Sequence, residues 1–550
     1  MISIVKQPDR ILTFCLASIL QIESRIMFNQ EEIQEQLEAF KSLTPLSDFV
    51  KAYVEKDGVR LHMPGHKGRS LQASSFLSDL VPYDLTEIEG ADSLYHAEGV
   101  IRQSEDIASI LFGTRHTYFS AGGSSQTLKT MCALAIQHLM ENRYKAAEAA
   151  RLDVIPNAMQ QSTGISMPKL GLGNPVIIAG RNAHKAFIQA SQLLQFDIRW
   201  IPSESKEYSL CGCNISANGL DDYLTSLEKK IPASSIAGIY LTSPDYLGNM
   251  LDIKALAEVA HNHGTLLLVD NAHGAYLRFM PEDLHPITLG ADISCDSAHK
   301  TLPVITGGSY LQISPCAPDF SDQDIRNTMS LFGSTSPSYL IMESLDQANE
   351  YLLEEASNDF EALTTRIEEL KYSLPDNLIF TGDEKTKLTL DLRASGLLDG
   401  NSVAQALRER DIECEYADPD YLVTMWAPGN SESDFEKVEE AFYELDTWAH
   451  EGGLAQSISK KADLKLDKLP EVLYQPYEIL NLPSETIAVE DAVGRIAAGL
   501  AVSCPPAVTP VIAGEMIEEE LIPILKHYGI TSISVLKSIF IAFLTKKDGI

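Results

Sequence analysis

The sequence lacks a hydrophobic run long enough to span a membrane. Near the amino terminus, residues 11–22 (ILTFCLASILQI) are apolar but too short for a transmembrane helix. They follow Lys6 and Arg10, yet no small-residue cleavage site of the kind that ends a signal peptide comes after them. Met27 opens a more helical segment, so residues 1–26 are interpreted as an accessory helix or a misassigned start. We therefore expect a cytoplasmic protein with no membrane partner.

Basic residues are scarce. The 550 residues include 43 Lys and Arg against 77 Asp and Glu, which gives a formal net charge of −34. A chain so acidic would repel a phosphate backbone rather than release its counterions, so we expect no nucleic-acid partner. The charge is compatible with a cationic substrate, although many acidic proteins have no such substrate.

Cysteine is also sparse and follows no metal-binding pattern. Of the eight cysteines only Cys211 and Cys213 are close together, and no second pair completes a zinc site. We expect reduced thiols and no bound metal. The sequence shows no tandem repeat and no low-complexity tract. With 45% hydrophobic residues, it is typical of a soluble globular protein of several domains.

The most informative stretch is residues 291–312, which contain Ser297-Ala298-His299-Lys300. A lysine after a hydroxyl, a small residue and a histidine, and before a Pro/Gly-rich segment, is typical of a Schiff-base lysine. Upstream, the apolar run 265–269 ends in Asp270. Such a run predicts a strand buried on both faces of a parallel sheet, with the acid at its carboxyl end. This pairing suits pyridoxal phosphate (PLP): Lys300 binds the aldehyde, and Asp270 keeps the pyridine nitrogen protonated.

A glycine-rich loop supports a phosphorylated cofactor. Residues 117–120 predict a strand, and residues 121–127 (AGGSSQT) open a helix. Glycines allow close approach to a ligand, and the first amides of a helix favour an anion. A further strand at residues 175–178 leads to Arg181-Asn182-Ala183-His184-Lys185. The ring of His184 could stack on a pyridine face or simply be satisfied by backbone hydrogen bonds.

Alternating strands and helices, each with polar residues at the strand's carboxyl end, predict a doubly wound α/β large domain. After residue 329 the pattern changes to that of a small α+β domain. The predicted organisation is an uncertain extension over residues 1–30, a helical arm over 31–60, a large PLP-binding domain over 61–330, a small α+β domain over 331–450, a linker over 451–470 and a carboxyl-terminal domain over 471–550.

The segment Leu61-His62-Met63-Pro64-Gly65-His66-Lys67-Gly68-Arg69 contains two histidines four residues apart. Pro64 and Gly65 disfavour the helix that would place both histidines on one face, so a metal site is not expected. The segment is interpreted as a basic loop near a phosphorylated cofactor or an acidic substrate group, with an ordinary turn as the alternative.

Together and in order, these motifs resemble those of the ornithine/lysine/arginine decarboxylase family, which are fold-type-I PLP enzymes. The resemblance rests on HMPGHKG, DLTE, AGGSS, RNAHK, TSPDYLG, DNAHGA, SAHKTLP and a terminal PP…P…GE, and extends from about residue 43 onward. It implies a large domain of the aspartate-aminotransferase type, and the chain resembles a short form without an amino-terminal receiver-like domain. It also implies at least a homodimer.

The resemblance assigns roles to residues of this chain. Lys300 binds PLP, Asp270 contacts the pyridine nitrogen, His184 stacks on the ring and Ala272 packs on its other face. The phosphate would be surrounded by Ser124, Ser125, Ser297 and His299. Three positions depart from the family pattern: Gly122 replaces the Asn of Asn-Gly-Ser/Thr, Asn271 replaces the Glu of Asp-Glu-Ala-His, and Ala507 replaces the Gly of Pro-Pro-Gly.

The expected activity is PLP-dependent decarboxylation of arginine, lysine or ornithine to an amine of the polyamine pathway, with Lys300 or His273 returning a proton to Cα. The sequence does not choose among the three substrates. One alternative is another fold-type-I enzyme, such as a lyase or an aminotransferase with Arg278 as its carboxylate-binding residue. Another is a non-catalytic regulatory homologue, which the presence of both Lys300 and Asp270 disfavours.

Overall fold

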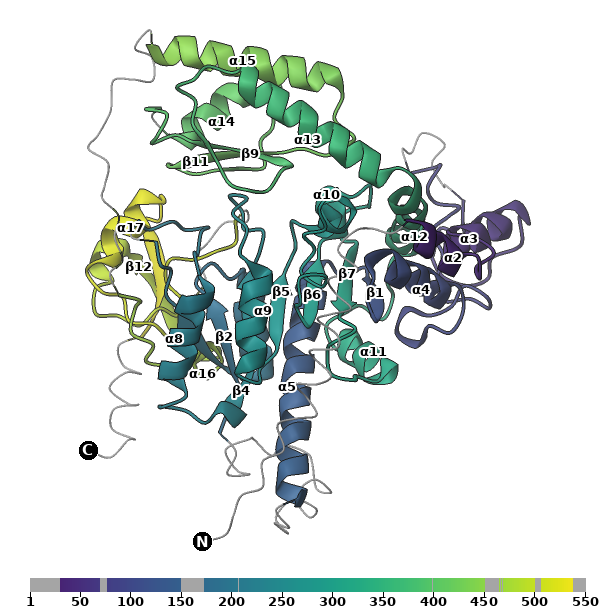
Figure 1. The fold of residues 1–550 in the computed structure, drawn as a ribbon, viewed down its shortest axis with the longest axis horizontal. Coiled ribbons are helices and arrows are strands. Elements are labelled where there is room, and N and C mark those ends of the chain that lie inside the picture. Colours follow the sequence, from purple (N-terminus) through teal and green to yellow (C-terminus); the bar gives the residue numbers. More distant parts are fainter. Residues whose placement is uncertain are drawn as a thin grey trace. The chain divides into compact units, whose positions relative to one another are not determined.

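The computed structural model describes residues 30–69, 77–149, 173–205, 207–397, 399–450, 464, 466, 468–499 and 506–537. The expectations for residues 1–26 and for most of the linker therefore lie outside the described residues. The chain divides into two compact units, one formed by residues 1–134 and 266–362, the other by residues 135–265 and 363–550. The predicted domain boundaries remain a prediction, and each unit is described below by itself (Figure 1).

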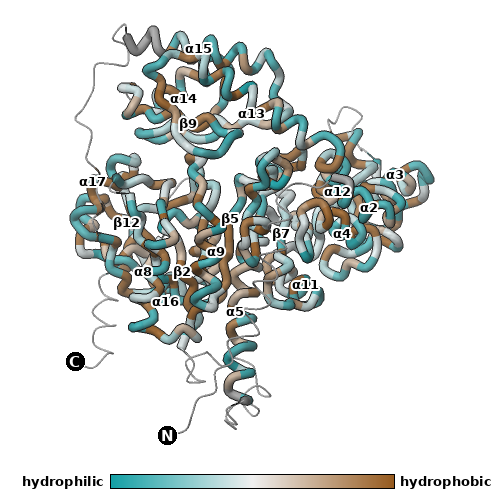
Figure 2. The backbone as a smooth tube through the Cα atoms, in the orientation of Figure 1, coloured by the Kyte–Doolittle hydropathy of each residue, from teal (hydrophilic) through white to brown (hydrophobic). Residues whose placement is uncertain are grey.

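The first unit contains four strands of the main sheet, in the order β1-β7-β6-β5. These are β1 (His116–Ser120), β5 (Leu267–Asp270), β6 (Ile293–Asp296) and β7 (Ser309–Ile313). β5 and β6 are parallel, with Asp270 opposite Cys295, whereas β7 runs antiparallel to both β6 and β1. Every residue of β5 and β6 is buried, as their apolar sequences predict, and Figure 2 shows β5 as strongly hydrophobic.

Helices and short turns complete this unit. They are α2 (Gln30–Leu37), α3 (Pro45–Glu55), η1 (Leu94–His96), α4 (Val100–Phe112), η4 (Ala275–Phe279), α10 (Ala298–Thr301), α11 (Asp322–Ser330) and α12 (Tyr339–Glu354). α5 (Ser124–Ala149) begins in the first unit and ends in the second. The first turn of α3 is capped by a side chain of α12, because Asp346 accepts hydrogen bonds from the amides of Leu46 (3.3 Å) and Ser47 (2.8 Å).

Glu343 lies beside this cap and carries a pH-dependent contribution to stability. Its side chain is 7% exposed, and within the described residues its Oε1 has no hydrogen-bond partner. Burial, followed by the negative charges of Asp346 and Asp84, raises the pKa of Glu343 to about 8. The folded protein therefore keeps a proton that the unfolded chain releases above its ordinary carboxyl pKa. Stability from this group falls as the pH rises, and it is lost once the pH exceeds about 8.

We expect Glu343→Gln to remove this pH dependence. Between pH 6 and pH 9 the variant should gain about 3 kcal/mol of stability relative to the native protein. The native protein loses this stability over roughly two pH units, between pH 6 and the raised pKa of Glu343. Melting temperatures at both pH values measure the effect. Glu350→Gln, on the exposed face of the same helix, is the control and should follow the native protein. Equal pH dependence in native protein and Glu343→Gln would contradict the prediction.

The second unit contains three parallel strands in the order β4-β2-β3. These are β2 (Val176–Gly180), β3 (Asp197–Ile201) and β4 (Ile236–Thr242), and they are accompanied by α7 (Lys185–Leu194), α8 (Ala217–Leu227), η3 (Ala233–Ser235) and α9 (Ile253–Asn262). Asp252 caps α9 by accepting a hydrogen bond from the amide of Ala255 (3.1 Å). The predicted α/β class with a mostly parallel sheet is confirmed, although the antiparallel β7 was not predicted.

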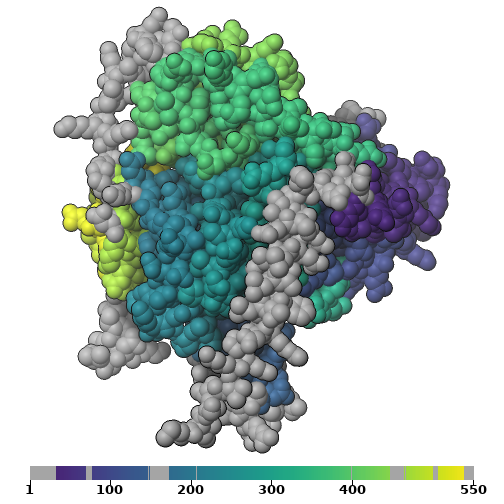
Figure 3. All heavy atoms as spheres, viewed as in Figure 1, coloured from purple at the N-terminus to yellow at the C-terminus, as the bar shows by residue number. Residues whose placement is uncertain are grey.

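The second unit also contains a four-stranded antiparallel sheet in the order β10-β11-β9-β8. Its elements are β8 (Phe380–Thr381), β9 (Lys387–Asp391), α14 (Gly400–Arg408), β10 (Tyr416–Ala417), β11 (Tyr421–Met425) and α15 (Glu432–His450). They are joined to α12 by α13 (Ala356–Ser373). These strands and helices follow the α+β pattern that the sequence indicates after residue 329. Figure 3 shows these elements in green as one continuous group of packed side chains.

The described carboxyl-terminal part contains a two-stranded sheet, two α-helices and a short 3-10 helix. They are α16 (Pro476–Ile479), β12 (Ser484–Ala488), η6 (Val489–Asp491), α17 (Leu521–His527) and β13 (Ser532–Leu536), with β12 and β13 antiparallel. Its own hydrophobic core includes Val489, Ile517, Leu521 and Val535. Tyr208, from the segment after β3, packs against this core.

Candidate active site

Lys300 lies on α10, one short turn after the end of β6. Its backbone amide donates to the carbonyl of Ser297 (3.0 Å), and its side chain is half-buried. The Lys300 Nζ atom lies 3.0 Å from Nε2 of His273, which belongs to the turn after the neighbouring strand β5. His273 is 3% exposed. The structure thus brings together the two residues that the sequence predicts as proton donors to Cα.

Asp270 is the last residue of β5 and is 3% exposed. Its Oδ1 accepts hydrogen bonds from the amide of Ala272 (3.2 Å) and from the thiol of Cys295 (3.6 Å). The turn that follows is held to β6, because the amide of Asn271 donates to the carbonyl of Cys295 (3.0 Å). β5 and β6 are parallel neighbours, so the predicted carboxylate and lysine follow the same ends of adjacent strands.

The glycine-rich loop opens α5, whose first two residues are Ser124 and Ser125. Gly123 has a φ of +68°, a conformation that favours glycine, and its amide donates to the carbonyl of Gly307 (2.8 Å). A Cβ at Gly122 would lie 2.6 Å from Oε1 of Gln126. Because the Gln126 amide occupies this space, glycine fits at position 122 where the family usually has asparagine.

Gly307, which accepts the hydrogen bond from Gly123, is followed by Gly308, which binds His299. The His299 amide donates to the carbonyl of Gly308 (3.2 Å), and its Nδ1 donates to the same oxygen (2.8 Å). Burial lowers the pKa of His299. Through Gly307 and Gly308, the AGGSS loop and the SAHK segment meet in one place within the first unit.

The residues of the first unit fit PLP. Ser297 is 0% exposed, and within the described residues its hydroxyl has no hydrogen-bond partner, so it can donate to a phosphate. The amino terminus of α5 adds amides that favour an anion. Lys300 supplies an amine for an aldehyde, and Asp270 supplies a buried carboxylate for a pyridinium.

His184 belongs to the second unit. It precedes the first residue of α7, and its Nδ1 accepts a hydrogen bond from the amide of Ala186 (3.1 Å), so Nε2 carries the proton. The predicted backbone hydrogen bond is therefore present. Stacking of His184 on a cofactor ring stays a prediction.

Arg278 does not serve as a free carboxylate-binding residue, and this candidate from the sequence is wrong. Its guanidinium forms a buried ion pair with Asp283 and donates to the carbonyl of Leu111 (3.3 Å). The arginine is 9% exposed and is used within the protein. The aminotransferase alternative loses its proposed residue.

Both histidines of the HMPGHKG loop are engaged by neighbours within the first unit. Nε2 of His62 lies 2.8 Å from the hydroxyl of Tyr53, and Nε2 of His66 lies 3.0 Å from Oδ2 of Asp84, in the DLTE segment. Within the described residues no group of three or more His, Cys, Asp or Glu side chains could hold a metal ion.

The RNAHK motif and the terminal GE motif contact each other within the second unit. The guanidinium of Arg181 binds both carboxylate oxygens of Glu515, at 2.9 and 2.8 Å. The carbonyl of Ala507 accepts a hydrogen bond from the amide of Lys185 (2.8 Å). These contacts therefore hold the carboxyl-terminal part of the second unit next to the end of β2.

Ala507, which replaces the family's glycine, has a φ of +55°. A Cβ in this left-handed region costs roughly 1–2 kcal/mol, partly offset by the smaller chain entropy of alanine. We expect Ala507→Gly to stabilise the protein by up to about 1 kcal/mol and to raise its melting temperature. Ala513→Gly, at a buried residue outside the left-handed region, is the control and should destabilise. A lower melting temperature for Ala507→Gly would contradict the prediction.

Sequence reasoning missed a buried polar cluster within the first unit, formed by Asn271, His285, Asp296 and Gln312, each 0% exposed. Asp296 accepts hydrogen bonds from the other three. The signal was available: Asp296 is an acid that ends the short buried strand ISCD, and Asn271 departs from the family pattern.

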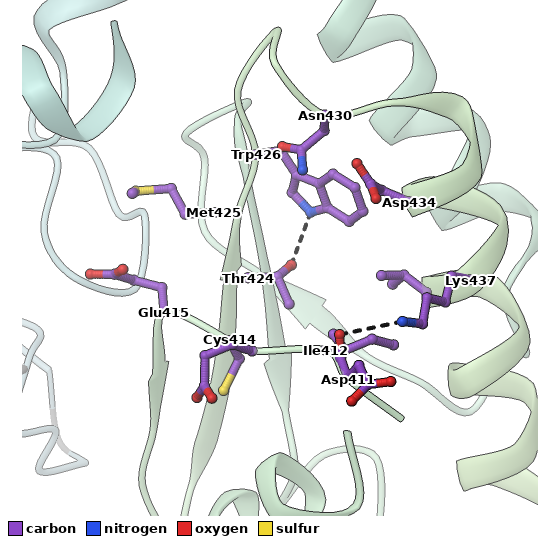
Figure 4. Close-up of a pocket in the computed structure, with 12 residues that line it drawn as sticks. Asp411, Ile412, Cys414, Glu415, Thr424, Met425, Trp426, Asn430, Asp434 and Lys437 are labelled. Atoms are coloured by element: carbon purple, nitrogen blue, oxygen red, sulfur yellow. Dashed lines mark hydrogen bonds between the residues drawn. The ribbon is translucent and has the colours of Figure 1, made fainter. Parts of the chain in front are cut away.

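A separate pocket of about 390 Å³ lies in the second unit and is lined by residues of β11 and α15 (Figure 4). Its wall combines the indole of Trp426 with several carboxylates, namely those of Asp411, Glu413, Glu415 and Asp434. It contains none of the predicted site residues. Across the described part of the chain, no helix is both long and apolar enough to cross a bilayer.

The fold is of the α/β class, and the residues around Lys300 and Asp270 fit PLP. A family model described as "Orn/Lys/Arg decarboxylase, major domain" matches residues 44–139 and 161–374, which is more than half of the chain. The chain belongs to the Orn/Lys/Arg decarboxylase family and is a decarboxylase.

Relatives of known name cover most of the chain. An arginine decarboxylase of Bacillus subtilis is 27% identical over 500 residues, covering 87% of this chain and 92% of the relative. An arginine decarboxylase of Halalkalibacterium halodurans is 26% identical over 498 residues, covering 86% and 91%. The solved structure of the constitutive lysine decarboxylase of Escherichia coli, 16% identical, matches with a TM-score of 0.67 and covers 92% of this chain and 83% of that chain. This likeness shows the fold.

Proposed function

We propose that this enzyme removes the α-carboxylate of a basic amino acid and releases the corresponding amine and carbon dioxide. The observation that carries the proposal is the 3.0 Å contact between Lys300 Nζ and His273 Nε2, next to the buried Asp270 at the end of the neighbouring strand. Arginine is the first candidate substrate because the named relatives are arginine decarboxylases, and lysine and ornithine are the others.

Bound PLP supplies an electron-accepting ring that stabilises the negative charge left on Cα when carbon dioxide departs. In the proposed site Lys300 would bind the aldehyde and Asp270 would hold the pyridine nitrogen. Ser124, Ser125, Ser297 and His299 would hold the phosphate. Ala272 and His184 would contact the ring.

Decarboxylation consumes one proton, which must be delivered to Cα. We propose that His273 or Lys300 donates it, and the hydrogen bond between their nitrogen atoms (3.0 Å) supports this because a proton can pass between the two residues. A proton leaving His273 can be replaced through Lys300, or the reverse. We propose that these two residues act as one proton-donating pair.

The net charge of −34 fits a cationic substrate, since it attracts arginine or lysine by long-range electrostatics. We further propose that the enzyme acts in the cytoplasm in polyamine synthesis and is at least a homodimer, as the resemblance to fold-type-I enzymes implies. The proposal includes no nucleic-acid and no membrane partner.

The test is carbon dioxide release from arginine, lysine and ornithine by the purified, PLP-loaded protein, with the amine products identified in the same samples. The expected result is release with one substrate strongly preferred. Absence of release from all three, despite visible absorbance from bound PLP, would refute the decarboxylase proposal and favour a lyase or aminotransferase. Absence of PLP binding would favour a regulatory homologue.

A further inference from the structure

We propose that Asp296 is a positioning residue for Asp270: it anchors the turn after β5 through Asn271, and its buried negative charge favours the protonated pyridine nitrogen of bound PLP. The inference rests on the proposed function, which places Asp270 against that nitrogen. It concerns only residues of the first unit.

Asp296 ends β6, directly before the SAHK segment, and is 0% exposed. Its Oδ1 accepts hydrogen bonds from Asn271 Nδ2 (2.8 Å) and Ser294 Oγ (3.4 Å). Its Oδ2 accepts from His285 Nε2 (2.9 Å) and Gln312 Nε2 (3.0 Å). Both carboxylate oxygens thus face only donors among these partners, which is the arrangement that stabilises an ionised carboxylate.

The partner His285 does not cancel this charge. Its Nδ1 accepts a hydrogen bond from the amide of Ile287 (3.3 Å), so that nitrogen carries no proton and the proton lies on Nε2. The imidazole is therefore neutral. The four partners of Asp296 are thus a neutral histidine, two side-chain amides and a hydroxyl. None of them cancels its buried negative charge.

Asp296 and Asp270 act on the same thiol. Burial, followed by the negative charges of Asp270 and Asp296, raises the pKa of the Cys295 thiol well above its ordinary value. Cys295 therefore stays protonated and donates to Oδ1 of Asp270 (3.6 Å). Because both acids act on Cys295, the buried charge of Asp296 also stabilises a cation held against Asp270, since the interior screens charge weakly.

The geometric link runs through Asn271, whose neighbours in the chain are Asp270 and Ala272. Its backbone amide binds the carbonyl of Cys295 (3.0 Å), and its side chain binds Asp296. The turn is thus fixed to β6 at two points, which orients Asp270 before it and His273 after it. The family's usual glutamate at position 271 would place a second carboxylate against Asp296, so asparagine at 271 and aspartate at 296 suit each other.

Three variants separate charge from geometry. Asp296→Asn removes the charge, and because Asn271 Oδ1 has no hydrogen-bond partner within the described residues, the Asn271 amide can flip to accept from the new amide. Asn271→Asp places two carboxylates face to face. The double variant Asn271→Asp/Asp296→Asn restores one carboxylate and one amide. Asp292→Asn is the matched control, since Asp292 is 3% exposed and accepts from the amide of Leu267 (2.8 Å) at the other end of β5.

The readouts are the dissociation constant of PLP, from its visible absorbance, and the melting temperature of the cofactor-free protein. We expect Asp296→Asn to weaken PLP binding about tenfold, by analogy with residues that orient the ligands of a bound metal. Asp292→Asn should leave PLP binding unchanged. Asn271→Asp should weaken binding more, and the double variant should recover most of that loss. Asn271→Ala removes the hydrogen bond between residue 271 and Asp296 without changing Asp296, and it should also weaken PLP binding. This variant therefore tests the inference if Asp296→Asn does not fold.

PLP affinity within twofold of native in Asp296→Asn and in Asn271→Ala would overturn the inference. A loss of affinity matched by Asp292→Asn would also overturn it, since the effect would then be general to buried acids of this strand. If the native protein bound no PLP, the proposed function would fail first, and the inference with it.

Discussion

Replacing Lys300 with alanine should lower carbon dioxide release by at least about 10⁴-fold, the size usual for removal of a central catalytic group. The substitution removes the amine to which the cofactor aldehyde binds and one member of the proton-donating pair with His273. It leaves a small side chain on the short helix α10, so the surrounding fold should persist. Initial rates with saturating PLP measure the effect, and the absorbance of the lysine-bound cofactor should be lost in the same preparation.

Two controls make this result specific. Lys254→Ala removes an exposed lysine of α9 and should keep the native rate. Lys300→Arg keeps a positive charge next to His273 but cannot bind an aldehyde as a primary amine does, so it should be as inactive as Lys300→Ala. A near-native rate in either Lys300 variant would refute the assignment of this residue. Inactivity of Lys300→Ala with normal activity of Lys300→Arg would mean that only charge is needed.

The parts of the site that could be predicted are those with a local signature. The apolar run before Asp270 specifies a buried strand, and the position of an acid at its end follows from the topology of parallel sheets. The SAHK segment is similarly local, because a lysine that follows a short strand and a hydroxyl has few structural explanations. Residues near these segments, such as Ser124 and His299, could be placed because each lies one turn from a predicted element.

The parts that could not be predicted depend on contacts between distant segments. Arg278 looked available in the sequence, and only the fold reveals its ion pair with Asp283. β7 pairs antiparallel with β6 and with β1, and its partner residues in β1 are nearly two hundred positions away in the chain. Asn271 stands where the family usually has glutamate, and the reason lies in Asp296, which accepts a hydrogen bond from the Asn271 side chain. Long-range partners of this kind leave no periodic pattern in a single sequence.

The second large effect is expected at Glu515, where substitution by glutamine should destabilise the protein by about 3–5 kcal/mol. Glu515 is 1% exposed, and both of its carboxylate oxygens bind the Arg181 guanidinium. Its Oε2 also accepts a hydrogen bond from the amide of Ile512 (2.7 Å). Glutamine has nearly the same shape but no charge, and its amide group would face the guanidinium. A buried cation would be left without its counter-charge.

The melting temperature of the PLP-loaded protein measures this loss, and Glu519→Gln, at an exposed site in the same segment, should leave it unchanged. A double variant tests the physical cause. Arg181→Met/Glu515→Met removes both charges, so it should be more stable than Glu515→Gln even though it deletes more hydrogen bonds. We expect this order of stability because in Glu515→Gln the Arg181 guanidinium stays buried without a counter-charge. It still contacts the Pro510 carbonyl (3.0 Å) and the ring of Trp200. If the double variant were instead less stable than Glu515→Gln, the attraction between Arg181 and Glu515 would itself stabilise the protein. The RNAHK and GE motifs would then be needed together for this ion pair.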